Sequence, residues 1–252
     1  MHELFVAADC SQNIIRVLFV DFSKAFDVID HNVLLNKFIS NNIPEHIIVW
    51  SLDFLNGRKQ FVKIGNSVSN TTVVGAGTPQ GTVSGPNDFK LVINDLTFNT
   101  CYAKYVDDTT VLSVSKDVCD VTLQTAADYL VSWAHNNGMT INTNKTKELI
   151  ICFNKKVNAE DIPPLCINRN NIERVNTFKL LGVFVSSDLS WDYHVMYILR
   201  KVAKRMYCIN YLFRAGVPAS DIVCVYTSII RSVLEYACPV WHPGLTKKLS
   251  KL

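Results

Sequence analysis

The sequence predicts an α+β fold in which helices flank an antiparallel sheet. Apolar, β-branched runs of strand length, such as residues 14–22, occur between amphipathic segments of helical period. Two strand-like runs, 101–106 and 109–114, have only two residues between them, which suits an antiparallel hairpin and is too short for a parallel crossover. From Trp191 onward the pattern is helical. This order of elements is typical of an α+β domain.

Bulk composition fits a folded protein and excludes several other classes. The chain has 252 residues, of which 48% are apolar and 19% charged, as in globular domains. No apolar run approaches the roughly 18 residues that span a bilayer, and the N-terminus lacks a signal-peptide pattern. We therefore expect an intracellular protein with no membrane partner. The net charge of +3 does not by itself indicate nucleic-acid binding.

The eight cysteines are too widely spaced for a zinc knuckle. Most have apolar neighbours, so we expect buried, reduced thiols.

The first elements follow from caps and β-branched runs. Residues 14–22 are predicted to form a buried strand that ends near Asp21. Asp30 is placed to cap a helix through residue 38. Pro44 begins a second helix through residue 55.

A hairpin and a glycine-rich loop come next. Residues 59–64 alternate and are predicted to pair with 71–74. Residues 75–86 contain four glycines and two prolines, which predicts a loop. A helix to about residue 96 follows.

Residues 101–106 and 109–114 are predicted to pair as a hairpin with Asp107 and Asp108 at its tip. An amphipathic helix over 118–135 and a strand over 148–153 continue the pattern. The helix has five apolar residues on one face: Leu123, Ala126, Ala127, Leu130 and Ala134.

A polar stretch after residue 153 predicts a boundary. We expect one domain over 1–153, a linker loop over 154–175 and a second domain over 176–252. The second domain should contain a strand over 178–185, a helix from Trp191 and a helix from Pro218 to about residue 236.

Asp21, Asp107 and Asp108 are the candidate catalytic residues. Two adjacent acids at a tight turn repel one another, and asparagine or glycine would form the turn without that cost. A bound divalent cation would reverse the penalty. Carboxylates suit Mg²⁺, which usually takes one or two of them together with substrate phosphates.

Five segments together resemble, in order and spacing, the palm motifs of reverse transcriptases. The third is the Tyr105-Val106-Asp107-Asp108 turn. The amino-acid sequences of the first motif and of the tail at 234–241 are most similar to those of non-long-terminal-repeat, LINE-type retrotransposons of the jockey type. The other four segments are 19–27, 78–86, 133–147 and 180–183, the last resembling the primer grip.

This resemblance implies a polymerase palm with a C-terminal helical thumb and a role for each matching residue. Asp21, Asp107, Asp108 and the Phe22 carbonyl would hold two Mg²⁺ ions, with Mn²⁺ as an alternative. Lys145 would act as a general acid for pyrophosphate. The nucleotide would contact Lys24, Ala25, Phe26, Gln80 and Gly81, and Leu181 and Gly182 would grip the primer.

Position 26 favours DNA over RNA as the product. RNA-dependent RNA polymerases resemble this motif but tend to carry an acid five residues after the first Asp, where this chain has Phe26. A phenyl ring would exclude the ribose 2′-hydroxyl, because burying that group unpaired costs roughly 1–3 kcal/mol. The resemblance therefore implies an RNA template, a DNA primer and deoxynucleoside triphosphates.

Basic residues gather in two further places. The helix from Trp191 carries Arg200, Lys201, Lys204 and Arg205, which a thumb could use to grip the template–primer backbone. Arg58, Lys59 and Lys63 on the earlier hairpin could add contacts.

Parts of the family pattern are missing from this sequence. Only 20 residues precede Asp21, so we expect truncated fingers, and no endonuclease or zinc-knuckle segment is present. Asn87 and Asp88 stand where apolar residues are more usual. A non-catalytic, nucleic-acid-binding relic is therefore the alternative. The resemblance also implies a ribonucleoprotein of nucleus and cytoplasm.

Overall fold

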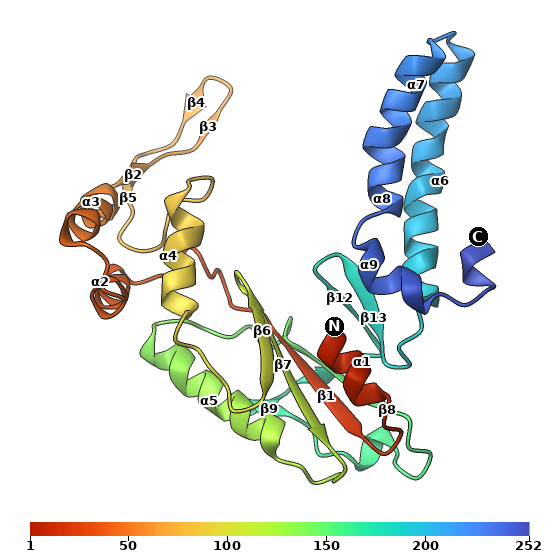
Figure 1. Cartoon of the computed structure of the whole chain (residues 1–252). Coiled ribbons are helices and arrows are strands. Elements are labelled where there is room, and N and C mark those ends of the chain that lie inside the picture. Colours follow the sequence, from red (N-terminus) through yellow and green to blue (C-terminus); the bar gives the residue numbers. More distant parts are fainter. Residues whose placement is uncertain (252) are drawn as a thin grey trace. The chain divides into compact units, whose positions relative to one another are not determined.

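Five strands form the central sheet of the computed structural model, which describes residues 1–251 (Figure 1). Their order is β11 (Glu173–Arg174), β8 (Lys147–Cys152), β1 (Ile14–Val20), β7 (Asp108–Ser115) and β6 (Cys101–Tyr105). β1 and β6 each pair antiparallel with β7, whereas β11 runs parallel to β8. The predicted antiparallel sheet is confirmed, with one short parallel pair at its edge.

β1 is the buried centre of this sheet, and all seven of its residues are buried. Leu18 and Val20 are two residues apart and so share one face, where they join the main hydrophobic core. Four helices supply most of the remaining core residues: α2 (His31–Ser40), α3 (Glu45–Leu55), α4 (Ser84–Ile93) and α5 (Thr122–Asn136).

The predicted helix signals are confirmed. The Asp30 side chain accepts a hydrogen bond from the Asn32 N–H at 2.7 Å and caps α2, and Pro44 precedes α3. α5 buries all five of the apolar residues assigned to its inner face: Leu123, Ala126, Ala127, Leu130 and Ala134.

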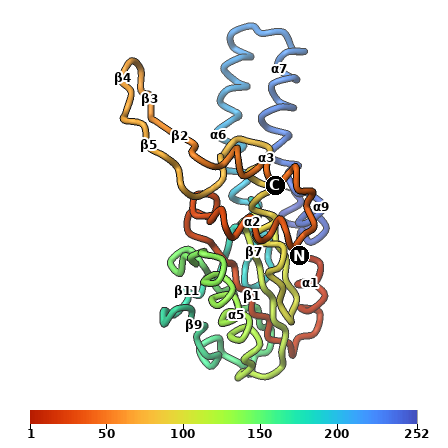
Figure 2. Tube along the Cα trace, turned by 90° about the vertical axis from the view of Figure 1, so that its left-hand side faces the viewer, coloured from red at the N-terminus to blue at the C-terminus, as the bar shows by residue number. Residues whose placement is uncertain are grey.

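The hairpin between α3 and α4 is split into two short ladders. β2 (Lys59–Gln60) pairs with β5 (Thr72–Val73) as predicted, but β3 (Lys63–Ile64) pairs with β4 (Ser67–Val68). The positive φ of Gly65 closes this inner turn. Figure 2 shows the β3–β4 end projecting beyond α3. The prediction for the outer half of the hairpin was therefore wrong.

Residues 154–175 are folded and do not form the predicted linker loop. They contain the 3₁₀ turn η1 (Ala159–Asp161) and a hairpin of β9 (Cys166–Ile167) with β10 (Asn170–Asn171). Four of their apolar residues, Ile162, Leu165, Ile167 and Ile172, are buried. The polar composition of the stretch hid this scattered apolar set, so the prediction missed it.

A hairpin replaces the single strand predicted over 178–185. β12 (Thr177–Leu180) and β13 (Val183–Ser186) are antiparallel, and Leu181 and Gly182 form the turn with φ values of 45° and 88°. Each strand has only four residues, and the turn between them has two. The two strands therefore look like one continuous strand in the sequence.

The helices after β13 form their own hydrophobic cluster. α6 (Asp192–Arg214) runs antiparallel to α7 (Ala219–Val225) in Figure 2. A π-helical turn, η2 (Tyr226–Arg231), joins α7 to α8 (Ser232–Leu234), and α9 (Cys238–Trp241), η3 (His242–Gly244) and η4 (Leu249–Lys251) follow. The cluster comprises Val183, Trp191, Val195, Ile198, Trp241 and Leu249.

The chain divides into two compact units whose boundaries differ from the predicted domains. One contains residues 14–148 and 157–174, and the other contains 1–13, 149–156 and 175–252. The N-terminal helix α1 (His2–Ala8) belongs to the second unit, where the Phe5 and Trp191 rings are 6.0 Å apart. This long-range contact carries no local sequence signal.

Two predictions from composition need correction. All eight cysteines are free as expected. None is buried, however, since each is either half-buried or exposed. One helical stretch, 219–244, is long and apolar enough to span a bilayer by those two criteria. The same stretch contains the Arg231–Glu235 ion pair, and Ala237 interrupts it with a φ of 52°.

Candidate active site

Strand register brings together the two acidic motifs. β1 and β7 pair with Val20 opposite Thr109. Asp21 directly follows β1 and Asp108 directly precedes Thr109, so this last pair of the register leaves the two acids next to one another. The sheet therefore joins two carboxylates that lie 87 residues apart in the sequence.

The turn that carries the acids is shifted by one residue from its predicted position. β6 and β7 pair with Tyr105 opposite Asp108, so Val106 and Asp107 form the two-residue turn. Val106 has a φ of 56°, which is sterically costly for a β-branched residue. Asp108 is therefore fixed by the sheet, whereas Asp107 stands at the exposed tip.

The three carboxylates act on one another electrostatically. Asp108 is an exposed residue, but the protein around its carboxyl group desolvates it in part. This partial burial raises the pKa of Asp108, and the charges of Asp107 and Asp21 raise it further. Among residues 1–251, no group of three His, Cys, Asp or Glu side chains is tight enough to enclose a metal ion. The three acids therefore do not form a closed metal site by themselves.

A neighbouring segment fixes the backbone around Asp21. The Ser23 N–H donates to the Thr140 carbonyl at 2.8 Å, and the Asn142 N–H donates to the Asp21 carbonyl at 2.8 Å. These bonds flank the isolated bridge between Phe22 and Ile141. Because successive carbonyls alternate in extended backbone, the Phe22 carbonyl points away from this segment. That orientation fits the predicted role of Phe22 as an oxygen ligand.

Thr146 and Lys145 end the same segment. The Asp21 N–H donates to the Thr146 hydroxyl at 3.2 Å, while Thr146 itself is completely buried. Lys145 lies in the turn that follows Asn142, and its side chain is exposed. Lys145 therefore lies next to the threonine that supports the Asp21 backbone, and within residues 1–251 its ammonium group has no hydrogen-bond or ion-pair partner.

The segment after Asp21 turns sharply under the predicted nucleotide site. Lys24 has a φ of 50°, and its carbonyl accepts from the Asp27 N–H at 2.8 Å. Ala25 is buried. Phe26 is half-buried, and its ring lies 4.9 Å from the buried ring of Phe89 on α4. This contact restricts the ring that the sequence predicts to be the steric gate.

Four hydrogen bonds tie the glycine-rich loop to that turn. The Thr78 N–H donates to the Phe26 carbonyl and the Gly77 N–H to the Ile29 carbonyl, both at 2.8 Å. A His31 ring nitrogen lies 3.0 Å from the Gly77 carbonyl. The Gln80 amide donates to the Asp27 carboxylate at 3.2 Å. The first two predicted motifs therefore meet as one unit.

Gly77 is the tightest point of this junction. It has a φ of 80°, and a Cβ atom built there would lie 2.6 Å from the Asp27 carbonyl oxygen. Gly81 has nearly the same φ, 81°, but a Cβ there would meet no atom within 4 Å. Close approach therefore requires glycine at position 77, whereas backbone conformation alone favours it at 81.

Asp88 is a buried acid. From the sequence it differs from the family pattern only in standing where an apolar residue is more usual. It lies on the buried face of α4 with 5% of its surface exposed. Burial raises the pKa of Asp88 to about 6, and the nearby His31 partly opposes this effect. The apolar spacing of α4 could have revealed its burial, since Asp88 is next to Phe89 and four residues before Val92.

A buried ion network supports the sheet beside the site, and no local sequence pattern predicts it. Glu148 is completely buried on β8 and accepts from Arg16 at 2.7 Å and from Arg174 at 2.9 Å. Arg174 also donates to the carbonyls of Ile162 and Pro163, each at 2.7 Å. The network joins β1, β8 and β11.

The predicted primer-grip residues lie at the β12–β13 turn, in the other unit. The Tyr236 hydroxyl donates to the Leu181 carbonyl at 2.8 Å. A Cβ at Gly182 would lie 3.0 Å from the Tyr236 ring. Tyr236 therefore packs directly against this turn.

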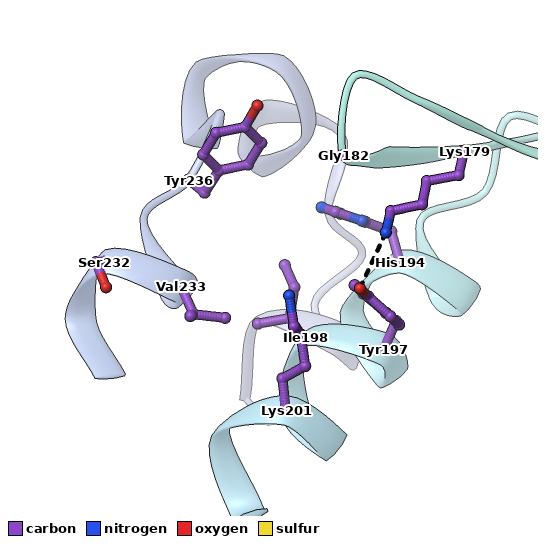
Figure 3. Close-up of a pocket in the computed structure, with 9 residues that line it drawn as sticks. All are labelled: Lys179, Gly182, His194, Tyr197, Ile198, Lys201, Ser232, Val233 and Tyr236. Carbon is purple, nitrogen blue, oxygen red and sulfur yellow. Dashed lines mark hydrogen bonds between the residues drawn. The ribbon is translucent and has the colours of Figure 1, made fainter. Parts of the chain in front are cut away.

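A pocket of about 280 Å³ adjoins the turn (Figure 3). Lys179 lines the pocket and donates to the Tyr197 hydroxyl at 3.2 Å, and Lys201 lies over the Tyr197 ring. Hydrogen bonds from Lys179 and Lys201 lower the pKa of Tyr197. This corner of the unit is strongly cationic.

The remaining predicted nucleic-acid contacts differ in exposure. Arg200, Lys201 and Lys204 are exposed on α6, whereas Arg205 is half-buried and donates to the Ile229 carbonyl of η2. Arg205 is therefore engaged in helix packing. On the hairpin, Lys59 and Lys63 are exposed and Arg58 is half-buried.

Comparison with known proteins agrees with the predicted family. The family model described as reverse transcriptase (RNA-dependent DNA polymerase) matches residues 6–185. The chain is 29% identical over 252 residues to a probable RNA-directed DNA polymerase from transposon X-element, and 26% identical over 248 residues to the RNA-directed DNA polymerase from mobile element jockey, both of Drosophila melanogaster. These alignments cover 95% and 93% of this chain. The predicted jockey-type resemblance is confirmed.

The chain spans about a quarter of the length of these curated relatives, 27% and 26%. Among solved structures, telomerase from Candida tropicalis in complex with a TWJ fragment of telomeric RNA matches with a TM-score of 0.53 at 11% identity. That match covers 98% of this chain and 42% of the telomerase chain. The likeness shows the fold alone, and the predicted palm-type architecture is confirmed.

Proposed function

The chain belongs to the reverse transcriptase (RNA-dependent DNA polymerase) family, and we propose that it is the polymerase core of a jockey-like, non-long-terminal-repeat retrotransposon. Its substrates would be an RNA template, a DNA primer and deoxynucleoside triphosphates. The register that sets Asp21 against Asp108 is the observation that carries this proposal. The remaining fingers and the endonuclease would come from the rest of the parent polyprotein, within a nuclear and cytoplasmic ribonucleoprotein.

Asp21, Asp107, Asp108 and the Phe22 carbonyl would hold two divalent cations, Mg²⁺ or Mn²⁺. Bound there, the ions would activate the primer 3′-hydroxyl and stabilise the pyrophosphate leaving group. Burial is the main cause that raises the pKa of Asp108, and the charges of Asp107 and Asp21 raise it further. The repulsion between these charges supports the role, because cation binding would relieve it.

The other residues would position the nucleotide. The turn at Lys24 and Ala25 would approach the triphosphate, and Gln80 and Gly81 would line the pocket. Phe26, supported by Phe89, would lie beneath the sugar and exclude a 2′-hydroxyl. Lys145 would donate a proton to pyrophosphate as it leaves.

Primer extension on an RNA template, with magnesium and deoxynucleotides, tests the proposal. Asp108→Asn should abolish incorporation, whereas Asp117→Asn should leave it unchanged. Asp117 is a matched control because it is an exposed acid just beyond the other end of β7. Incorporation that survives Asp108→Asn would contradict the assignment.

A non-catalytic nucleic-acid-binding relic is the second candidate. The open arrangement of the three acids within residues 1–251 favours keeping it. Salt-sensitive binding of template–primer without any incorporation by the unmodified chain would support the relic.

A further inference from the structure

The outward face of α6 carries a stripe of aromatic and basic side chains, which we call the tyrosine stripe. Its members recur at alternating spacings of four and three residues, so they line one side of a helix with 3.6 residues per turn. The stripe covers roughly 30 Å at 1.5 Å per residue. In order, it consists of Tyr193, Tyr197, Arg200, Lys204, Tyr207, Tyr211 and Arg214.

Three of the four tyrosines are far more exposed than large aromatic side chains usually are, whereas Tyr197 is half-buried. Tyr207 is 71% exposed, Tyr211 is 65% exposed and Tyr193 is 52% exposed. The Tyr207 and Tyr211 rings are stacked, with centroids 6.5 Å apart and planes at 24°. The opposite face of α6 packs into its unit through Val195 and Ile198, so burial of the tyrosines is not required for folding.

From Tyr193 to its C-terminal end, this helix carries charge of a single sign. No Asp or Glu occurs from Tyr193 to Arg214, whereas five residues are Arg or Lys. Within residues 1–251, none of these five forms an ion pair with a carboxylate. An ordinary solvated helix face would interleave acids with these bases. The face is therefore complementary to an anionic partner.

At the N-terminal end of the stripe, cations and rings are in direct contact. The Lys179 ammonium lies 5.1 Å from the centre of the Tyr197 ring, and so does that of Lys201 (Figure 3). Tyr193 and Tyr197 each place their rings 4.8 Å from Phe184. Aromatic and basic side chains therefore alternate along the sequence of the helix and also contact one another in the folded structure.

We propose that the tyrosine stripe binds an unpaired nucleic-acid strand, with tyrosines stacking on bases and Arg200, Lys204 and Arg214 contacting phosphates. Alternating aromatic and basic side chains are the usual means of binding single strands without sequence preference. A duplex keeps its bases stacked inside and could use only the charges. Either the template RNA ahead of the site or a displaced DNA strand supplies this chemistry, and the identity of the strand rests on the proposed function.

Fluorescence anisotropy of labelled oligonucleotides bound to the full chain, without nucleotides, tests the stripe. Single-stranded RNA, single-stranded DNA and a duplex of equal length serve as probes. Tyr207→Leu with Tyr211→Leu should weaken single-strand binding at least about tenfold, because stacking is lost at two positions. Duplex binding should change less than twofold. The preferred strand distinguishes template RNA from displaced DNA.

Phe213→Leu is the matched control, since Phe213 is an aromatic residue of the same helix that is 75% exposed but outside the stripe. It should leave all affinities unchanged. Lys204→Gln should reduce the salt dependence of single-strand and duplex binding alike. Equal losses for single strands and duplex in the double variant would overturn the proposal. So would equal effects of Phe213→Leu, or failure of the unmodified chain to bind single strands.

This assay is independent of catalysis. Asp108→Asn should bind single strands normally even though it cannot extend a primer. Failure of primer extension alone would therefore contradict the proposed function and leave the stripe intact.

Discussion

At the scale of single residues, two glycines in one loop are required for different reasons. Both have a positive φ, but only one of them is also in close contact with another part of the backbone. Gly77 and Gly81 have almost the same positive φ, but only Gly77 has a backbone oxygen where a Cβ would be. The loop can therefore accept a side chain at one position more easily than at the other. That difference can be measured, because both substitutions carry the same conformational cost.

Gly81→Ala should lower the free energy of unfolding by about 1 kcal/mol, the usual cost of a left-handed alanine. Gly77→Ala should cost at least about 1 kcal/mol more, because the Asp27 carbonyl must move. Urea unfolding of both variants measures the difference. Equal losses would show that the loop relaxes freely around position 77.

Phe26 controls the choice of sugar at the same scale. Phe26→Val should admit ribonucleotides, raising their incorporation relative to deoxynucleotides about tenfold or more, because the 2′-hydroxyl is no longer buried without a partner. Primer extension with each nucleotide type measures this ratio. Phe61→Val is a suitable control, since Phe61 is 57% exposed on the hairpin. Unchanged selectivity in Phe26→Val would remove the gate assignment.

At the scale of elements, the sheet depends on one buried carboxylate. Glu148 pairs with Arg16 of β1 and Arg174 of β11, and no water can reach its side chain. Removing one charge from such a network leaves the others buried and uncompensated. The register of β1, which positions Asp21, is supported by this contact.

Glu148→Gln should lower the free energy of unfolding by about 3–5 kcal/mol. Glu173→Gln is the matched control, because Glu173 pairs with Lys147 at 2.6 Å but is 67% exposed. That exposed pair should contribute less than about 1 kcal/mol. Chemical denaturation of both variants tests the contrast, and similar losses would show that Glu148 is not the anchor.

At the scale of the whole molecule, the pH dependence of stability reflects Asp88. Burial raises its pKa from 3.8 to about 6. The folded chain therefore binds a proton that the unfolded chain releases between these values. The stability that this proton contributes is complete below pH 3.8 and is lost as pH rises through about 6.

Asp88→Asn should remove this component of the pH dependence. The variant should gain stability relative to the unmodified chain between pH 4 and pH 7, since asparagine stays neutral throughout. Unfolding free energies at several pH values measure the gain. Asp53→Asn, which changes an exposed acid on α3, should show no such gain. A constant difference between Asp88→Asn and the unmodified chain would contradict the raised pKa.

The parts of the fold that could be predicted from the sequence are those set by residues close together in the chain. β-branched runs located β1 and β7, Asp30 capped α2 as expected, and the apolar spacing of α5 named its buried face. Each of these signals acts between residues a few positions apart. Errors arose where short strands join without a clear break, as at Leu181 and Gly182, and where scattered apolar residues fold a polar stretch, as in 154–175.

The acidic motifs, their order and the family of the chain can be read from the amino-acid sequence alone. Which of these motifs meet depends on how the chain folds. Only strand pairing could place Asp21 against Asp108, and only the packing of α4 could bury Asp88 and hold Phe26. Folding likewise brings Glu148 into contact with Arg16 and Arg174. These contacts join residues far apart in the chain, so no local pattern specifies them, and they form only when the core brings the elements together.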